Sequence, residues 1–211
     1  MKAVILSGGF GTRIAEETHN RPKPMIEIGG KPILWHIMKI YSYYGVNDFI
    51  ICCGYKGNII KEYFSNYSIL SSDITYDLQK NSIKVHKKNA EPWKVTVVDT
   101  GEATMTGGRI KKIQNYLKNE KNFCVTYGDG VSDINIKKSI EFHLKQKKIA
   151  TIAAVHPPSR FGALEIKQNL ISKFVEKPAG DNTFINGGFF VFSHKIFESI
   201  KYSNSILEKD V

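Results

Sequence analysis

The chain begins with MKAVILSGGFGTR at residues 1–13, where an apolar run passes directly into a glycine-rich, charged run. Residues 2–6 form a short, mainly apolar run bounded by Ser7, Gly8 and Gly9, which is typical of a buried strand. Glycines that follow a strand let backbone N–H groups approach phosphate oxygens closely. We therefore predict a buried first strand with an anion-binding loop at its carboxyl end.

Apolar runs recur along the chain and alternate with amphipathic segments. They predict further strands at residues 48–53, 94–99, 122–127, 149–155 and 187–192. The segments between them predict helices at residues 32–44, 58–67, 106–117, 134–148 and 195–200. Residues 74–85 and 161–176 have the pattern of antiparallel hairpins. Repeated strand–helix units imply an α/β fold, doubly wound around a mainly parallel sheet, with small antiparallel excursions.

The length and composition fit one domain over residues 1–211, because apolar residues make up 42% of the chain. Residues 203–211 show no obvious terminal element, and no run approaches the ~20 apolar residues of a membrane helix. We expect no signal peptide. Three cysteines, Cys52, Cys53 and Cys124, lie in apolar runs without metal-type spacing, which predicts reduced, structural thiols in the cytoplasm.

The formal net charge of +10 admits three explanations: nucleic acid binding, a site for phosphorylated metabolites, and a lysine-favouring genome. The lysines are scattered and not interleaved with aromatic residues, which argues against nucleic acid. Arginines are rare, so they can mark positions that need a planar, forked donor. They are Arg13, Arg21, Arg109 and Arg160.

Two common phosphate-binding motifs are absent from the glycine-rich loop. A P-loop needs Lys and Ser or Thr after its last glycine, but Gly11 is followed by Thr12 and Arg13. A dinucleotide fingerprint needs a third glycine, which is missing, and the second predicted strand ends in Cys53-Gly54 rather than in an acid for a ribose. Neither a P-loop nucleotidase nor a nicotinamide enzyme is therefore indicated.

The loop continues to Lys23, which stands between Pro22 and Pro24. Prolines on both sides stiffen the backbone that presents the ammonium group. Two cations, Arg13 and Lys23, near a glycine cradle suit a triphosphate whose α-phosphorus is attacked, because fixed cations offset the negative charge that develops. If the nucleophile is itself a phosphate, no general base and no covalent intermediate are required.

The segments GGFGTR at 8–13 and KPM at 23–25 together resemble the N-terminal signature of the sugar nucleotidyltransferases. Segments at 26–36, 49–57, 98–101 and 105–109 narrow the resemblance to the glucose-1-phosphate cytidylyltransferase family. It extends from residue 1 to about residue 192. It implies a Rossmann-like, glycosyltransferase-A-like fold and a cytoplasmic homo-oligomer. It also implies that CTP and α-D-glucose 1-phosphate give CDP-glucose and pyrophosphate for surface polysaccharide. Family members continue past residue 211 with a second metal-binding aspartate, so we expect this chain to lack a C-terminal segment.

The resemblance also implies site residues. It assigns the nucleotide to Leu6, Ser7, Gly8, Gly9, Phe10, Gly11, Thr12, Arg13, Lys23, Thr104, Arg109 and Gly128. It assigns the sugar phosphate to Gly162, Glu176, Lys177, Asn186 and Gly187. The implied catalytic residues are Arg13, Lys23 and Asp129, and Asp129 would hold Mg²⁺, since a carboxylate at the end of a buried strand can do so while phosphates and water fill the other positions. Asp133 is predicted to cap a helix and His36 to pack or cap.

Alternatives from different classes remain open at this point. The same chemistry could use another base, as thymidylyl or uridylyl transfer to a sugar 1-phosphate. The chain could also be an inactive, nucleotide-binding regulatory subunit. Nucleic acid binding and membrane association are the partner classes that the sequence disfavours.

Overall fold

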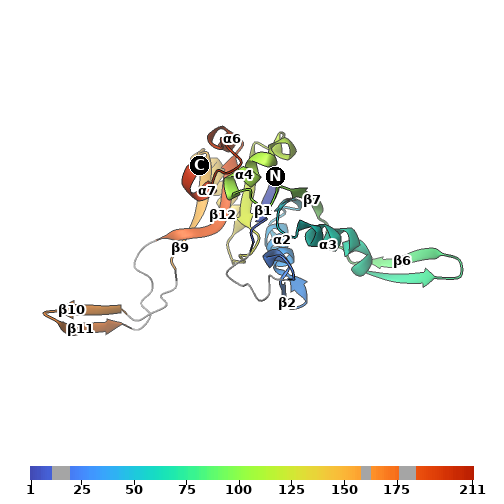
Figure 1. Ribbon diagram of the computed structural model, residues 1–211, viewed down its shortest axis with the longest axis horizontal. Coiled ribbons are helices and arrows are strands. Elements are labelled where there is room, and N and C mark those ends of the chain that lie inside the picture. The colour runs from blue at the N-terminus through green and yellow to red at the C-terminus, as the bar shows by residue number, and fades with distance from the viewer. Residues whose placement is uncertain (11–19, 158–162, 176–183) are drawn as a thin grey trace. The chain divides into compact units, whose positions relative to one another are not determined.

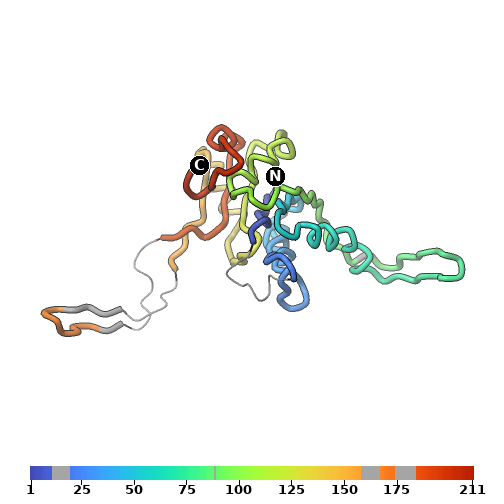
Figure 2. Tube along the Cα trace, viewed as in Figure 1, coloured from blue at the N-terminus to red at the C-terminus, as the bar shows by residue number. Residues whose placement is uncertain are grey.

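The computed structural model describes residues 1–10, 20–157, 163–175 and 184–211 (Figures 1 and 2). The chain divides into two compact units. The first comprises residues 1–151 and 190–211, and the second comprises residues 152–189. The first unit contains the glycine-rich loop as far as residue 10 and also Asp129.

The central sheet has the strand order β7-β4-β1-β8-β12-β9, and Figure 1 labels several of these strands. Their bounds are β1 Lys2–Ser7, β4 Asp48–Cys53, β7 Lys94–Asp99, β8 Asn122–Tyr127, β9 Ala150–Val155 and β12 Ile185–Ser193. β1 pairs in parallel with β4 and β8, and β4 pairs in parallel with β7. The predicted strands and the mainly parallel, doubly wound fold are confirmed. Because the chain runs outward from β1 to β7 and then returns to the other side of β1, the strand order reverses between β1 and β8.

The helices that the structure describes agree with the predicted ones except at three places: η2 and α7 were not predicted, and the helix predicted at 106–117 is interrupted. They are α2 Ile33–Tyr43, α3 Gly57–Leu70, α4 Thr106–Lys112, α5 Ile136–Gln146, α6 Ile196–Ser199, α7 Leu207–Asp210 and the 3₁₀ helices η2 Lys23–Met25 and η3 Gln114–Leu117. The helix predicted at 106–117 is broken after Lys112, because the Ile113 N–H donates to the Ile110 carbonyl three residues back. α7 is a terminal helix that the sequence did not indicate. No described helix is both long enough and apolar enough to cross a membrane.

Three two-stranded antiparallel pairs lie outside the central sheet. They are β2 Glu27–Ile28 with β3 Lys31–Pro32, β5 Ser72–Asp77 with β6 Ser82–Lys88, and β10 Ala163–Lys167 with β11 Leu170–Val175. The second and third confirm the predicted hairpins. The first is unpredicted, and the left-handed Gly29 and Gly30 form its turn. The His36 ring contacts the Ile28 carbonyl at 2.9 Å, which agrees with a packing or capping role.

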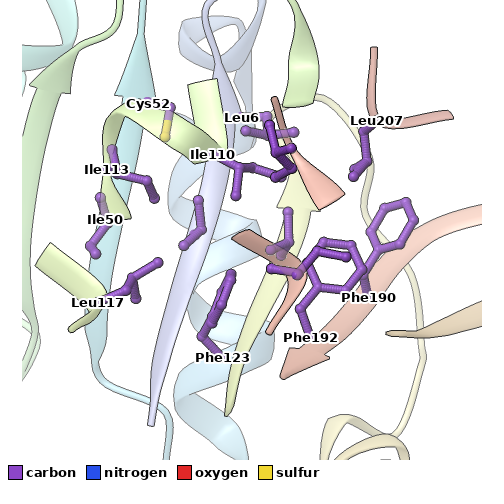
Figure 3. Close-up of a cluster of buried hydrophobic side chains, with 14 of the residues drawn as sticks. Leu6, Ile50, Cys52, Ile110, Ile113, Leu117, Phe123, Phe190, Phe192 and Leu207 are labelled. Carbon is purple, nitrogen blue, oxygen red and sulfur yellow. The ribbon is translucent and has the colours of Figure 1, made fainter. Parts of the chain in front are cut away.

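The core lies on both faces of the sheet because side chains alternate along each strand. Figure 3 shows one face, where strand residues such as Leu6 and Ile50 pack against α4, η3 and the C-terminal helices. The buried members are Val4, Leu6, Ile50, Cys52, Ile110, Ile113, Leu117, Phe123, Val125, Phe190, Phe192, Ile196, Phe197, Ile200 and Leu207. Ala3 and Ile5 point to the opposite face and are fully buried, as are Leu34 and Ile37 of α2. Helices therefore fix β1 from both sides.

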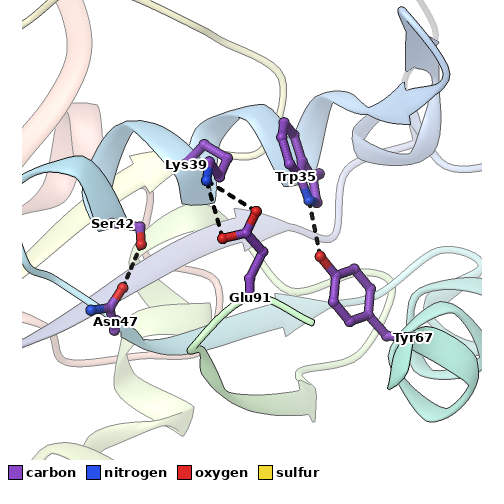
Figure 4. Close-up of polar contacts among 6 residues, drawn as sticks. All are labelled: Trp35, Lys39, Ser42, Asn47, Tyr67 and Glu91. Carbon is purple, nitrogen blue, oxygen red and sulfur yellow. Dashed lines mark hydrogen bonds and ion pairs between the residues drawn. The ribbon is translucent and has the colours of Figure 1, made fainter. Parts of the chain in front are cut away.

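Polar contacts anchor α2, the helix that follows the glycine-rich loop and η2 (Figure 4). The Trp35 Nε1–H donates to the Tyr67 hydroxyl of α3 at 3.1 Å. Lys39 Nζ donates to both carboxylate oxygens of Glu91 at 3.0 and 3.1 Å. These bonds tie α2 to α3 and to the segment before β7, so the start of α2 has a fixed position.

The prediction that Asp133 caps a helix is wrong. α5 begins at Ile136, and its cap is Asn135, whose Oδ1 accepts from the Lys138 N–H at 2.9 Å. Asp133 lies too far upstream to reach those N–H groups. At the other end of α5, the buried His143 ring bonds Thr151 Oγ1 at 2.8 Å and Asn122 Oδ1 at 3.1 Å. α5 is thereby fixed to β8 and β9.

We predict that His143 makes the fold sensitive to mild acid. Burial lowers the pKa of His143 below its ordinary value of about 6.5. His143 then binds a proton more readily in the unfolded chain than in the folded one. Its contribution to the free energy of unfolding is therefore complete above about pH 7 and is lost as the pH falls below about 6.5. Thermal unfolding between pH 7.5 and 5.5 should therefore show a smaller loss for His143→Gln than for the wild type.

The exposed His86 of β6 provides the matched control. His86→Gln should keep the wild-type pH dependence. Parallel curves for the wild type and His143→Gln would contradict the assignment.

Candidate functional site

A cavity of about 540 Å³ opens at the carboxyl ends of β1 and β8. Its size lies within the range of small-molecule sites. Its position is the point where the strand order reverses, which is where open α/β sheets bind ligands. Its wall is formed by Leu6, Ser7, Gly8, Gly9, Phe10, Lys23, Pro24, Glu102, Ala103, Thr104, Met105, Thr106, Arg109, Tyr127, Gly128 and Asp129.

The structure brings most of the predicted nucleotide and metal residues into this one wall. All of those that it describes line the cavity, namely Leu6, Ser7, Gly8, Gly9, Phe10, Lys23, Thr104, Arg109, Gly128 and Asp129. The remaining predicted residues of the loop, Gly11, Thr12 and Arg13, lie outside the described residues. The strand ends therefore gather segments that are more than 100 residues apart in the sequence.

The predicted sugar-phosphate residues belong to the second unit or lie outside the described part. Gly162, Glu176 and Lys177 are outside the described residues. Asn186 Oδ1 accepts from the Gly188 N–H at 2.7 Å. A Cβ on Gly187 would lie 3.0 Å from the Ala153 carbonyl oxygen, so this glycine lets β12 approach β9 closely.

Lys23 and Asp129 form an ion pair in the cavity wall. Lys23 lies in η2, where the buried Pro22 and Pro24 flank it. Its Nζ donates to Asp129 Oδ2 at 2.5 Å, and the two side chains are 21% and 38% exposed. The cation predicted for the phosphates and the carboxylate predicted for the metal are therefore paired with each other.

Gly128 joins the end of β8 to the end of β1. Its N–H donates to the Leu6 carbonyl at 2.9 Å. A Cβ at this position would lie 2.5 Å from Ser7 Oγ and 2.9 Å from Pro24 Cγ, so only glycine fits. The buried Ser7 hydroxyl has no hydrogen-bond partner among the described residues. An unpaired hydroxyl in a cavity wall can bond a ligand without breaking a protein contact.

Arg109 of α4 lies in the cavity wall, and its terminal N–H groups donate hydrogen bonds to the protein itself. Its guanidinium makes five hydrogen bonds of 2.7 to 3.0 Å. The acceptors are the carbonyls of Gly8, Cys53, Gly101 and Glu102 and the hydroxyl of Thr100. Burial lowers the pKa of Arg109, but a guanidinium stays protonated in proteins. The guanidinium therefore joins the last residue of β4 to the loops that follow β1 and β7.

Glycines make room for this guanidinium. A Cβ on Gly8 would lie 2.0 Å from Arg109 Nη1, and one on Gly54 would lie 2.7 Å from the same atom. The sequence explains Gly8 by the approach of a phosphate, whereas the structure adds that any side chain would displace the arginine. The expectation that rare arginines need a forked donor agrees with the geometry of Arg109.

The C-terminal segment supports the cavity in a way that the sequence did not indicate. Glu208 of α7 accepts from the Tyr127 hydroxyl at 2.5 Å and from the Thr106 hydroxyl at 2.8 Å. Both donors line the cavity. Six lining residues escaped prediction: Pro24, Glu102, Ala103, Met105, Thr106 and Tyr127. Each of the six lies within two positions of a predicted site residue in the sequence, which was the available signal.

The thiols of the three cysteines do not line the cavity. Burial raises the pKa of the Cys53 and Cys124 thiols to about 12 and raises that of Cys52 further still. All three are buried and unbridged. They are inert thiols at neutral pH, as the apolar runs around them predict.

Comparison with known proteins adds independent information. The family model described as nucleotidyl transferase matches residues 2–210. The glucose-1-phosphate cytidylyltransferase of Salmonella typhimurium (strain LT2) is 55% identical over 210 residues, which span 100% of this chain and 82% of that protein. A Bacillus subtilis (strain 168) protein named probable glucose-1-phosphate cytidylyltransferase is 45% identical over 211 residues. The match covers 100% of this chain and 82% of that protein.

A solved structure resembles the fold over nearly the whole chain. It is HddC from Yersinia pseudotuberculosis, complexed with GMP-PN. The TM-score is 0.70 at 29% identity, and the match covers 99% of this chain and 84% of that one.

We predict that Gly8→Ala destabilises the protein by about 1–3 kcal/mol, the usual cost of overpacking a tight site. The methyl group must displace a guanidinium that is held by five bonds. Gly9→Ala is the matched control, since a Cβ there meets no atom within 4 Å. Thermal unfolding of both variants is the measurement.

A double-mutant cycle identifies the cause. In an Arg109→Ala background, Gly8→Ala should cost much less, because the obstructing group is gone. An equal cost in both backgrounds would show that the arginine is not what excludes a side chain.

Proposed function

The chain belongs to the nucleotidyl transferase family, and we propose that it condenses CTP with α-D-glucose 1-phosphate to give CDP-glucose and pyrophosphate. The family is the one indicated by the segments around residues 8–13 and 23–25. The choice of CTP and glucose 1-phosphate is supported by relatives at 55% and 45% identity whose names specify this reaction. The observation that carries the proposal is that one cavity wall contains all of the described residues that were predicted to bind the nucleotide.

The reaction forms one phosphorus–oxygen bond and breaks another. A phosphate oxygen of the sugar phosphate attacks the α-phosphorus of CTP, and the bond to the bridging oxygen breaks as pyrophosphate leaves. The nucleophile is already an anion, so the chain need only bring two anions together and offset the charge that grows on the departing oxygens. Lys23 is suited to this task, since η2 holds its backbone and its Nζ lies in the cavity wall.

The donor set around Asp129 suits Mg²⁺ held partly by substrate. Among the described residues, no group of three or more His, Cys, Asp or Glu side chains could hold a metal by itself. Mg²⁺ is usually bound through one or two carboxylates, with phosphates and water at the remaining positions. The Asp129 carboxylate, 38% exposed at the cavity, provides one such oxygen ligand. When bound there, the ion would supply positive charge next to the phosphates.

The other parts of the proposal rest on the family resemblance. Arg13 would join Lys23 at the triphosphate, and the sugar phosphate would contact Gly162, Glu176, Lys177, Asn186 and Gly187. We further propose a cytoplasmic homo-oligomer that serves surface polysaccharide synthesis, without nucleic acid or membrane partners. Thymidylyl transfer and uridylyl transfer are the competing reactions. Comparing CTP, dTTP and UTP as substrates distinguishes them from cytidylyl transfer.

We predict that the protein releases pyrophosphate from CTP, glucose 1-phosphate and Mg²⁺, and that Asp129→Asn lowers this rate at least ~10²-fold, in line with removal of a transition-state contact. The assay should use the full-length protein and should compare CTP with UTP and dTTP. Asp133→Asn is the control, because it removes a nearby exposed carboxylate and should keep wild-type turnover. Near-wild-type turnover by Asp129→Asn would refute the metal role.

We predict that Lys23→Met strengthens binding of Mn²⁺ in the absence of nucleotide by up to about fivefold. That factor corresponds to the ~1 kcal/mol of a partly exposed ion pair, which the metal must otherwise break to reach Asp129. Arg21→Met is the control, since it removes the same charge from a pair with Glu27 at 3.2 Å. Metal titration followed by electron paramagnetic resonance is the measurement.

The same Lys23→Met protein should bind CTP more weakly, because the ammonium is lost from the phosphate site. Equal Mn²⁺ affinities for the wild type, Lys23→Met and Arg21→Met would contradict competition between lysine and metal for Asp129.

A further inference from the structure

The cavity wall has a charged part and a mainly uncharged part. Lys23 and Asp129 supply an ammonium and a carboxylate, which suit phosphates and a metal ion. Leu6, Ala103 and Thr104 carry no charge and suit the planar, largely neutral base of the same nucleotide. The segment between β7 and α4, residues 100–105, therefore offers the wall against which a base can lie.

This segment is folded into a defined turn. The Thr104 hydroxyl donates to the Thr100 carbonyl at 2.6 Å. The Gly101 N–H donates to Asp99 Oδ1 at 2.9 Å, and Gly101 has a φ of +86°. A Cβ on Gly101 would lie 3.2 Å from Thr104 Oγ1, so the turn is closely packed as well as hydrogen-bonded.

Two cationic side chains on one face of α4 donate hydrogen bonds to this turn. Arg109 and Lys112 are three residues apart, a spacing that places side chains next to each other on a helix. Arg109 donates to the Thr100 hydroxyl and to the carbonyls of Gly101 and Glu102. Lys112 Nζ donates to the Thr100 carbonyl at 2.8 Å and to Thr104 Oγ1 at 3.0 Å.

Lys112 itself does not line the cavity. Its side chain is exposed and reaches the turn through Thr100 and Thr104. Its hydrogen bond to Thr104 is a direct contact with a residue of the cavity wall. Its influence on a ligand must therefore pass through the turn.

Resting on the proposed function, we propose that Lys112 is a positioning residue for base recognition: from outside the cavity it fixes the turn at residues 100–104, which reads the base of the nucleotide. Cytosine and uracil differ at ring position 4, where one carries an amino donor and the other a carbonyl acceptor. Discrimination between them requires protein groups held within a fraction of an ångström. Loss of the lysine should make the turn less rigid and lower the preference for CTP over UTP.

The test compares Lys112→Met with two other variants of the full-length protein. Lys112→Arg keeps a cationic donor at the position. Lys111→Met removes the neighbouring lysine of α4, whose Nζ donates to the Phe197 carbonyl at 2.9 Å and so holds a different segment. The readouts are kcat and KM for CTP, UTP and glucose 1-phosphate, together with the Kd of CTP and of UTP by calorimetry.

We expect Lys112→Met to raise the KM and Kd for CTP about tenfold, the scale of one charge-assisted hydrogen bond. The preference for CTP over UTP should fall by a similar factor, while kcat and the KM for glucose 1-phosphate change little. Lys112→Arg should recover most of the preference, and Lys111→Met should keep it. An unchanged CTP-to-UTP ratio in Lys112→Met would overturn the proposal. So would an equal change in Lys111→Met.

The binding measurements separate this inference from the proposed reaction. A wild-type protein that prefers CTP in binding but releases no pyrophosphate would contradict the reaction, and the Kd ratio of Lys112→Met would still decide the role of the lysine. A wild-type protein that binds CTP and UTP equally would overturn the positioning role.

Discussion

The buried guanidinium of Arg109 joins the carboxyl ends of three neighbouring strands, β1, β4 and β7, and the shape of the cavity depends on it. Burying a cation costs several kcal/mol unless strong partners replace water, and hydrogen bonds to a charged group contribute about 1.5–3 kcal/mol each. The five bonds of Arg109 supply those partners, although carbonyl oxygens and one hydroxyl take the place of a carboxylate. The wall is therefore organised around a positive charge that the protein itself satisfies.

The two cationic side chains of the cavity wall, Arg109 and Lys23, have different roles. Arg109 holds the protein together through a rigid fork, which is the geometry that arginine provides and lysine does not. Lys23 instead has a single point charge, paired with Asp129 in the cavity wall, and in the proposed function this pair gives way to contacts with phosphate and metal. Glycine is required after β1 and β4 because a side chain on Gly8 or Gly54 would collide with Arg109.

Sequence reasoning was effective where one local rule governed the outcome. The apolar runs gave the strands β1, β4, β7 and β8, because a strand buried on both faces has few alternatives. Ten of the sixteen residues that line the cavity were named by the family resemblance, and they lie together because parallel strands bring their carboxyl ends to one edge. Asp133 was misassigned because a cap depends on where the helix starts, and α5 starts two residues later than predicted. α7 and the contacts of Glu208 depend on Thr106 and Tyr127, about 100 and 80 residues away, so no local pattern reveals them.

We propose that a nucleotide lies in the cavity at the ends of β1 and β8 while Arg109 remains bound to the protein. A crystal structure of the full-length protein with CTP and Mg²⁺ tests it most directly. We expect phosphates beside Lys23 and Asp129, the base against residues 102–104, and Arg109 still bonded to the Gly8 and Glu102 carbonyls. A nucleotide bound elsewhere, or an Arg109 side chain that has left those carbonyls to hold the phosphates, would contradict it.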